Sequence, residues 1–115
     1  MALRSRLAAL IAGGYVVAAC AVSDGRAAGD VSAGRQKALM CQTCHGLDGR
    51  AKIPEAPNLA GQNALYLAKA LKDYRSGARK NDMMSLVAPT LKDKDIDDLA
   101  AYYSAIDVTV APPPK

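Results

Sequence analysis

The sequence predicts an all-α domain of three to four short helices joined by long loops. Three segments carry apolar residues at helical spacing, and the stretches between them are rich in glycine, proline and asparagine. Only residues 108–110 resemble a strand. We expect one domain over residues 28–107 and a proline-rich tail over residues 108–115, because APPPK cannot continue a helix.

The first 27 residues are expected to be a secretory signal peptide. Arg4 and Arg6 give a basic opening, and an apolar run of 16 residues follows from Leu7 to Val22. About 20 apolar residues are needed to cross a bilayer, so a permanent transmembrane helix is the less favoured interpretation. The sequence therefore predicts an exported protein.

Two cleavage positions fit this leader. Small residues at Gly25 and Ala27 favour a cut before Ala28. The stretch Val17-Ala18-Ala19-Cys20 is instead similar to the lipobox of bacterial lipoproteins, with residues 1–19 as the lipoprotein signal. A lipidated Cys20 would tether the protein to a membrane, whereas in the first case Cys20 is discarded with the leader.

The charge of the chain does not favour a polyanionic partner. The formal net charge is +4 for the whole sequence and +2 once residues 1–27 are removed. Phenylalanine and tryptophan are absent, so no aromatic platform alternates with the basic residues. We therefore expect no nucleic-acid partner.

The first predicted helix covers residues 30–40. Asp30 is a suitable N-cap, and Val31, Ala38 and Leu39 fall on one side of the helix. This helix leads directly into the cysteine motif described below.

The second predicted helix covers residues 63–77 and ends at Gly77, a residue that often stops helices. Lysine and other polar residues occupy one face. The opposite face is an apolar stripe made of Tyr66, Leu67, Ala70, Leu71 and Tyr74.

The third predicted helix covers residues 93–106. Aspartates crowd its first turn, where the positive end of the helix dipole favours them: Asp93, Asp95, Asp97 and Asp98. Its apolar face is made of Ile96, Leu99, Ala100, Tyr103 and Ile106.

Three short helices and two long loops, over residues 45–62 and 76–90, do not supply a self-sufficient core for so short a chain. Another group is needed in the middle of the fold. The motif CQTCH at residues 41–45, which holds the only histidine of the chain, indicates what that group is.

Three chemistries use such paired cysteines. A redox disulfide normally opens a helix after a strand, but here a predicted helix precedes Cys41. A structural zinc site needs four ligands, and Cys41, Cys44 and His45 supply three. Covalent haem attachment explains every feature, since two thiols add to the haem vinyl groups and the next residue, His45, ligates the iron. We expect one haem c per chain.

Methionine is the expected sixth ligand of the iron. The chain has no second histidine, Met1 leaves with the leader, and Met40 directly precedes Cys41 on the proximal side. Elimination therefore leaves Met83 and Met84, both in the loop after the second predicted helix.

The chain resembles a class I c-type cytochrome. The resemblance covers nearly all of residues 28–106 and rests on AGDVSAGRQKA, CQTCHGLDG, PNLAGQNALYLAKAL, YRSGARKNDMMS and LKDKDIDDLAAYYS. It is closest to the short bacterial subgroup that includes the dihaem cytochromes c and the cytochrome subunit of flavocytochrome c sulfide dehydrogenase. The second motif of the dihaem members is absent from this sequence. The family fold wraps short helices and long loops around one covalently bound haem.

The resemblance also assigns the remaining site residues. It implies that the iron ligand is Met84, seven positions before Leu91, with Met83 as the second choice. It implies that the Pro57 carbonyl accepts the outer ring N–H of His45, and that Leu59 belongs to the same haem-binding loop.

Two structural details follow from the same resemblance. The first and last helices are expected to cross, with Gly34 close to Tyr102 or Tyr103. The subgroup often has a capping serine where Lys92 stands, and we expect Asp93 to replace this cap.

The sequence thus predicts an exported, periplasmic, monohaem carrier of single electrons that has redox proteins as partners and no small-molecule substrate. One alternative is the haem subunit of a larger dehydrogenase, and another is a haem-based gas sensor with a weak sixth ligand. A basic cluster could dock an acidic partner or be an ordinary solvated face: Lys69, Lys72, Arg75, Arg79 and Lys80.

Overall fold

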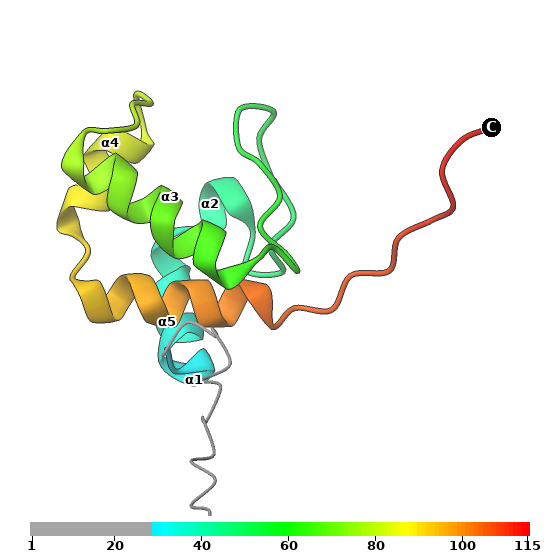
Figure 1. Cartoon of the computed structure of the whole chain (residues 1–115), viewed down its shortest axis with the longest axis horizontal. Coiled ribbons are helices and arrows are strands. Elements are labelled where there is room, and N and C mark those ends of the chain that lie inside the picture. Colours follow the sequence, from blue (N-terminus) through cyan, green and yellow to red (C-terminus); the bar gives the residue numbers. More distant parts are fainter. Residues whose placement is uncertain (1–28) are drawn as a thin grey trace, which may run out of the picture.

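The computed structural model describes residues 29–115 (Figure 1), so the predicted signal peptide and Cys20 lie outside the described residues. The part described contains five α-helices, two 3₁₀ turns and no strand, which confirms the all-α prediction. The strand-like appearance of residues 108–110 was misleading, because these residues are exposed and unpaired in the extended tail. None of the helices within residues 29–115 has the length and apolarity needed to cross a membrane.

The order of elements is α1 (Val31–Lys37), η1 (Ala38–Met40), α2 (Gln42–His45), α3 (Ala64–Ser76), α4 (Met84–Val87), η2 (Ala88–Thr90) and α5 (Asp93–Ser104). The three predicted helices correspond to α1 with η1, to α3 and to α5. The one-turn helices α2 and α4 are too short to show an apolar period, and they lie in or beside segments expected to be loops.

Helix α1 begins as predicted, because the Asp30 carboxylate accepts the N–H of Ala33 at 2.7 Å. Its predicted apolar face was only partly correct. Ala38 is fully buried, whereas Val31 is 48% exposed and Leu39 is 49% exposed. The reason is that α1 meets α5 at Gly34, and Ala38, the first residue of η1, belongs to the buried cluster, whereas Val31 and Leu39 do not.

Helices α1 and α5 cross each other (Figure 1). Gly34 of α1 lies against Asp98 and Tyr102 of α5. A β-carbon at this position would overlap the carbonyl oxygen of Asp98 and lie 2.7 Å from the β-carbon of Tyr102. Neither neighbour can move easily, because one is helix backbone and the other is buried. The expected closeness of Gly34 and Tyr102 is therefore confirmed.

Substituting Gly34→Ala should lower the free energy of unfolding by about 1–3 kcal/mol, because the new methyl group forces α1 away from α5. Denaturant titration of the purified protein measures this change. Ser32→Ala, at an exposed position of the same helix, is the matched control and should change stability by less than about 0.5 kcal/mol. An unfolding midpoint for Gly34→Ala equal to that of Ser32→Ala would contradict the crossing.

Helix α3 has the predicted ends. The Asn63 side chain accepts the N–H of Tyr66 at 3.1 Å, and Gly77 stops the helix with a left-handed φ of 82°. The predicted apolar stripe was wrong at one edge: Leu67 and Ala68 are buried, whereas Tyr66 is 50% exposed. Tyr66 lies at the exposed edge of α3, where its hydroxyl accepts a hydrogen bond from Arg79 at 3.5 Å, while Ala68 packs inside.

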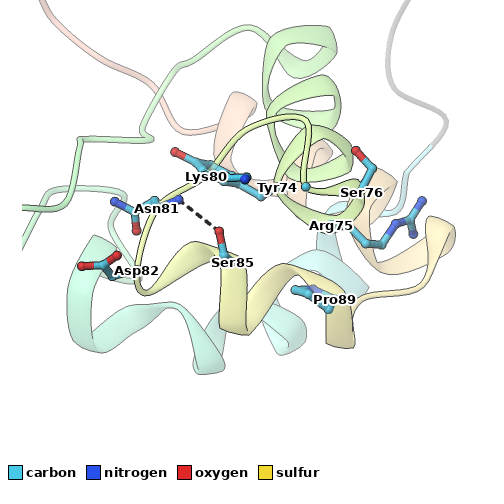
Figure 2. A pocket seen from close by; sticks show the side chains of 9 residues that line it. Tyr74, Arg75, Ser76, Lys80, Asn81, Asp82, Ser85 and Pro89 are labelled. Atoms are coloured by element: carbon cyan, nitrogen blue, oxygen red, sulfur yellow. Dashed lines mark hydrogen bonds between the residues drawn. The ribbon is translucent and has the colours of Figure 1, made fainter.

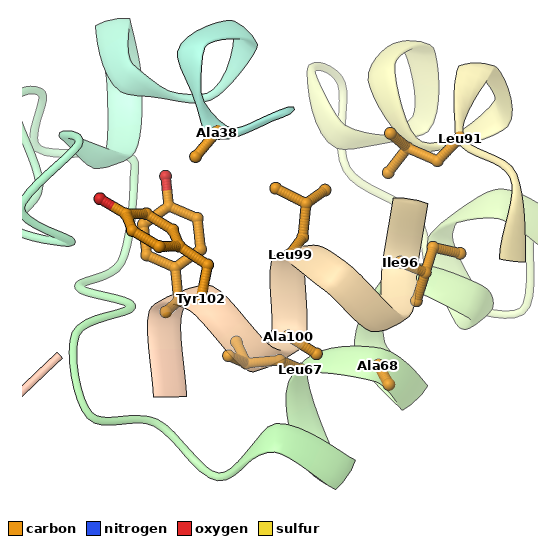
Figure 3. Packing of buried hydrophobic residues seen from close by; sticks show 9 residues of the cluster. Ala38, Leu67, Ala68, Leu91, Ile96, Leu99, Ala100 and Tyr102 are labelled. Carbon is orange, nitrogen blue, oxygen red and sulfur yellow. The ribbon is translucent and has the colours of Figure 1, made fainter. Parts of the chain in front are cut away.

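Helix α5 forms the centre of the core (Figure 3). Ile96, Leu99, Ala100 and Tyr103 are buried as predicted, while Ile106 lies beyond the helix end and is partly buried. Further buried residues on α5 are Asp98, Ala101 and Tyr102. Ile96 is fully buried, and Leu99 and Tyr103 are nearly so.

The predicted cap of α5 needs a correction. The N–H of Lys92 donates to the Asp95 carboxylate at 2.9 Å, and Asp93 instead pairs with Arg75 at 2.5 Å. A carboxylate three residues after the N-cap reaches back to the N-cap amide, as in a capping box, whereas Asp93 is too close in sequence to do so. Two hydrogen bonds lower the pKa of Asp95: the larger effect comes from the N–H of Lys92, and the smaller from the side chain of Lys37.

Candidate cofactor site

The cysteine motif forms a single helical turn. The N–H of His45 donates to the carbonyl of Cys41 at 2.9 Å, within the turn that includes α2. Residues three and four positions apart lie on the same face of a helix. Cys41, Cys44 and His45 therefore face the same side, with Cys41 partly buried against the core.

His45 is buried and has a fixed orientation. Its Nδ1 lies 3.0 Å from the carbonyl oxygen of Pro57. A carbonyl only accepts hydrogen bonds, so Nδ1 carries the proton and Nε2, on the opposite edge of the ring, has its lone pair available for a metal. The predicted contact between His45 and Pro57 is present.

Two adjacent tyrosines of α5 hold the start of the loop that leads from His45 to Pro57. The Tyr102 hydroxyl donates to the Leu47 carbonyl at 2.6 Å, and the Tyr103 hydroxyl donates to the Gly46 carbonyl at 3.1 Å. Burial raises the pKa of Tyr103 well above its usual range, so this hydroxyl stays protonated and remains a donor. Sequence reasoning missed both contacts, because the partners are backbone carbonyls more than fifty positions away.

Gly49 holds the later part of the same loop. Its carbonyl accepts the N–H groups of Leu59 at 2.8 Å and of Ala60 at 3.0 Å. Leu59 packs partly buried against the core. These contacts place Pro57, two residues earlier, against His45.

The two thiols are free of a disulfide bond. Burial, and to a lesser degree the nearby Cys44, raise the pKa of the Cys41 thiol to about 11. Redox-active thiols have lowered pKa values, so this environment does not suit a catalytic disulfide. Across residues 29–115, no three side chains of His, Cys, Asp or Glu gather closely enough to hold a metal ion. Two thiols beside one oriented imidazole do suit covalent haem.

The two candidate methionines lie on a different element. Met84 is the first residue of α4 and is partly buried, whereas Met83 is 59% exposed. Helix α4 packs against α3 and η2, while α2 packs against η1. The structure thus brings together Cys41, Cys44, His45 and Pro57, and it presents the methionines from a separate part of the fold.

Comparison with known proteins identifies the family. The family model described as Cytochrome c matches residues 31–106. The chain is 48% identical over 81 residues to cytochrome c-554(548) of Halomonas halodenitrificans, a match that covers 68% of this chain and 98% of the relative. It is also 43% identical over 70 residues to the thiosulfate dehydrogenase electron acceptor of Stutzerimonas stutzeri, which covers 60% of this chain and 32% of that protein.

A solved structure agrees with these matches. Reduced recombinant cytochrome c4 from Pseudomonas stutzeri is similar with a TM-score of 0.66 and 39% sequence identity. The match covers 72% of this chain and 48% of the solved chain, so this chain spans about half the length of that relative. Family, fold and the oriented motif agree: the chain belongs to the cytochrome c family, whose members are electron carriers rather than enzymes, and its cofactor is one covalently bound haem c.

Proposed function

We propose that this protein is an exported, monohaem carrier of single electrons in the bacterial periplasm. Cys41 and Cys44 form the thioether bonds, and His45 and Met84 are the axial ligands. The observation that carries the proposal is the orientation of His45. This residue lies on the same helical turn as both thiols, and its Nδ1 donates to the carbonyl of Pro57. The partial burial of Met84 beside the exposed Met83 supports the choice of distal ligand.

The residues of this chain orient and shield the cofactor. When bound, haem c supplies an iron that accepts and releases one electron. The Pro57 carbonyl keeps the proton on Nδ1 of His45 and so strengthens Nε2 as a ligand. Leu59 and the apolar core exclude water, and a dry site favours the reduced state of the iron.

The proposed partners are redox proteins. One relative is named as the electron acceptor of a thiosulfate dehydrogenase, and this supports a dehydrogenase as the electron donor. The second candidate function is a haem subunit within a larger dehydrogenase complex, as in the proposed kinship to the cytochrome subunit of flavocytochrome c. Purification at fixed stoichiometry with a partner would support the subunit, whereas isolation as a separate protein would support the free carrier.

The proposal is tested on the exported protein. We expect a c-type absorption spectrum in the reduced state, a chain mass raised by one haem, and only weak carbon monoxide binding to the reduced protein at neutral pH. Absence of the added mass would overturn covalent attachment. Ready binding of carbon monoxide would overturn the six-coordinate carrier and favour the gas sensor. The same mass measurement tests whether Cys20 carries lipid, and thereby the membrane tether.

Two of the five cations in the basic cluster at residues 69–80 are paired with carboxylates. Lys69 pairs with Asp73, and Arg75 pairs with Asp93. Arg79 is exposed, and its guanidinium lies 4.7 Å from the ring centroid of Tyr74, a contact that keeps its positive charge. Lys72 and Lys80 are exposed as well. These three cations are the part of the cluster that we propose for docking.

Replacing Lys72, Arg79 and Lys80 by glutamine should lower the association rate with an acidic redox partner about tenfold at low salt, because the cations steer the encounter. Stopped-flow kinetics over a range of ionic strength measures this rate, and the wild-type rate should fall steeply as salt rises. The control is Lys69→Gln, since the charge of Lys69 is already offset by Asp73. A wild-type rate independent of salt would contradict a docking role.

A further inference from the structure

We propose that Asn81 is a positioning residue that holds the backbone of the methionine ligand. The proposal rests on the function proposed above, because it concerns how strongly the Met84 sulfur stays on the iron. In this proposal Asn81 acts through the main chain, since its side-chain oxygen accepts the N–H of Met84.

Asn81 exchanges hydrogen bonds with the three residues at the start of α4 and just before it. Its side-chain oxygen accepts the N–H of Met83 and the N–H of Met84, both at 3.0 Å. In return, the Ser85 hydroxyl accepts the N–H of Asn81 at 3.0 Å, drawn as a dashed line in Figure 2, and the N–H of Ser85 donates to the Asn81 carbonyl at 2.9 Å. This exchange resembles a capping box, in which two side chains satisfy each other's free amides.

Outside the hydrogen bonds of Asn81, the approach to Met84 is fixed at one point by the N–H of Arg79, which donates to the Asp73 carbonyl at 3.0 Å, and helix α4 itself packs against α3 and η2. All residues from 76 to 83 are exposed, so no buried side chain anchors the approach to Met84. Helix α4 has only four residues, and a helix of one turn is not stable by itself. The two hydrogen bonds of Asn81 are therefore the side-chain restraint that acts directly on the backbone of Met83 and Met84.

Water has access to these bonds. A surface hollow of about 520 Å³ lies beside α4, and Asn81 and Ser85 both line it (Figure 2). If the Asn81 side chain is removed, water can satisfy the freed amides of Met83 and Met84 without any loss of packing. The cost of moving Met84 away from the iron is then reduced.

The expected effect can be measured with imidazole as a competing ligand for the ferric protein. Imidazole binds only while the sulfur is off the iron, so its apparent Kd is inversely proportional to that open fraction. Loss of a typical cap changes such an equilibrium about fivefold. Asn81→Ala should therefore lower the apparent Kd for imidazole about fivefold, and Ser85→Ala should lower it by a smaller factor.

Two further variants separate positioning from general stability. Asn81→Asp keeps an acceptor for both N–H groups at a helix start and should restore the wild-type Kd. Asn63→Ala removes the same type of cap from α3, where Asn63 accepts the N–H of Tyr66, and is the matched control. It should lower thermal stability to a similar degree and leave the imidazole Kd within about twofold of wild type.

Equal imidazole affinities for Asn81→Ala and wild type would overturn the proposal, as would an Asn81→Asp variant that behaves like Asn81→Ala. An effect of Asn63→Ala as large as that of Asn81→Ala would also overturn it, since the effect would then reflect general loosening. Failure of the proposed function gives a different result. In that case wild type would bind imidazole as tightly as Met84→Ala, because Met84 would not be a ligand at all.

Discussion

A variant with alanine at both Cys41 and Cys44 should release its haem completely on denaturation, whereas the wild-type chain should keep it. The two thiols lie on one helical turn with His45, and no other cysteine occurs in residues 29–115. Without thioether bonds, only the axial ligands hold the cofactor, and these are lost when the chain unfolds. Denaturing gel electrophoresis with haem staining, together with intact mass, measures the retained haem.

The single variants sharpen this prediction. Cys41→Ala and Cys44→Ala should each give either a product with one thioether bond or a low yield of loaded protein. Thr43→Ala is the matched control, because Thr43 lies between the thiols, is exposed and has no expected bond to the haem. Haem that stays with the double variant through denaturation would show that attachment occurs elsewhere.

The helices were largely predictable because their signals are local. Asp30, Asn63 and Gly77 cap helix ends through hydrogen bonds or backbone angles within a few residues. The face of each helix was less predictable, since it depends on which neighbour packs there. Val31 fits an amphipathic pattern and is still 48% exposed, because α5 approaches α1 at Gly34.

The residues of the site likewise fall into those with a local sequence signal and those whose partners lie far away in the sequence. The spacing of Cys41, Cys44 and His45 identified the cofactor, because one helical turn is enough to present all three side chains. The role of the Pro57 carbonyl came from the family resemblance and not from spacing. The hydroxyl groups of Tyr102 and Tyr103 were missed, since nothing local to α5 indicates that its tyrosines bind backbone carbonyls beside the motif.

The helix that follows Asn81 could not be predicted for another reason, which is its length of one turn. The sequence from Asn81, Asn-Asp-Met-Met-Ser, indicated a loop, but the loop after α3 ends at Met83 and helix α4 begins at Met84. The one-turn helix α4 exists because the Asn81 side chain and the Ser85 hydroxyl close its first turn. Such short elements are set by two or three side-chain bonds and leave no apolar period to detect.

Met84→Ala should open the sixth coordination position of the iron, and Met83→Ala should leave it closed. The structure supports this difference, because Met84 is partly buried at the start of α4 while Met83 is 59% exposed. A sulfur bound about 99% of the time reduces the apparent affinity for any competing ligand about 100-fold, and removing the sulfur restores that affinity. Met84→Ala should therefore bind carbon monoxide about 100-fold more tightly than wild type in the reduced state.

Two measurements check this prediction on the same samples. Carbon monoxide titration of the reduced protein gives the affinity, and the weak band near the red end of the ferric spectrum reports the bond between sulfur and iron. Met84→Ala should lose the band, and Met83→Ala should keep it and bind carbon monoxide no better than wild type. Met83→Ala is a close control because Asn81 accepts the N–H groups of both methionines. If Met83→Ala lost the band and Met84→Ala retained it, the ligand would be the exposed Met83, and α4 would have to rotate to present it.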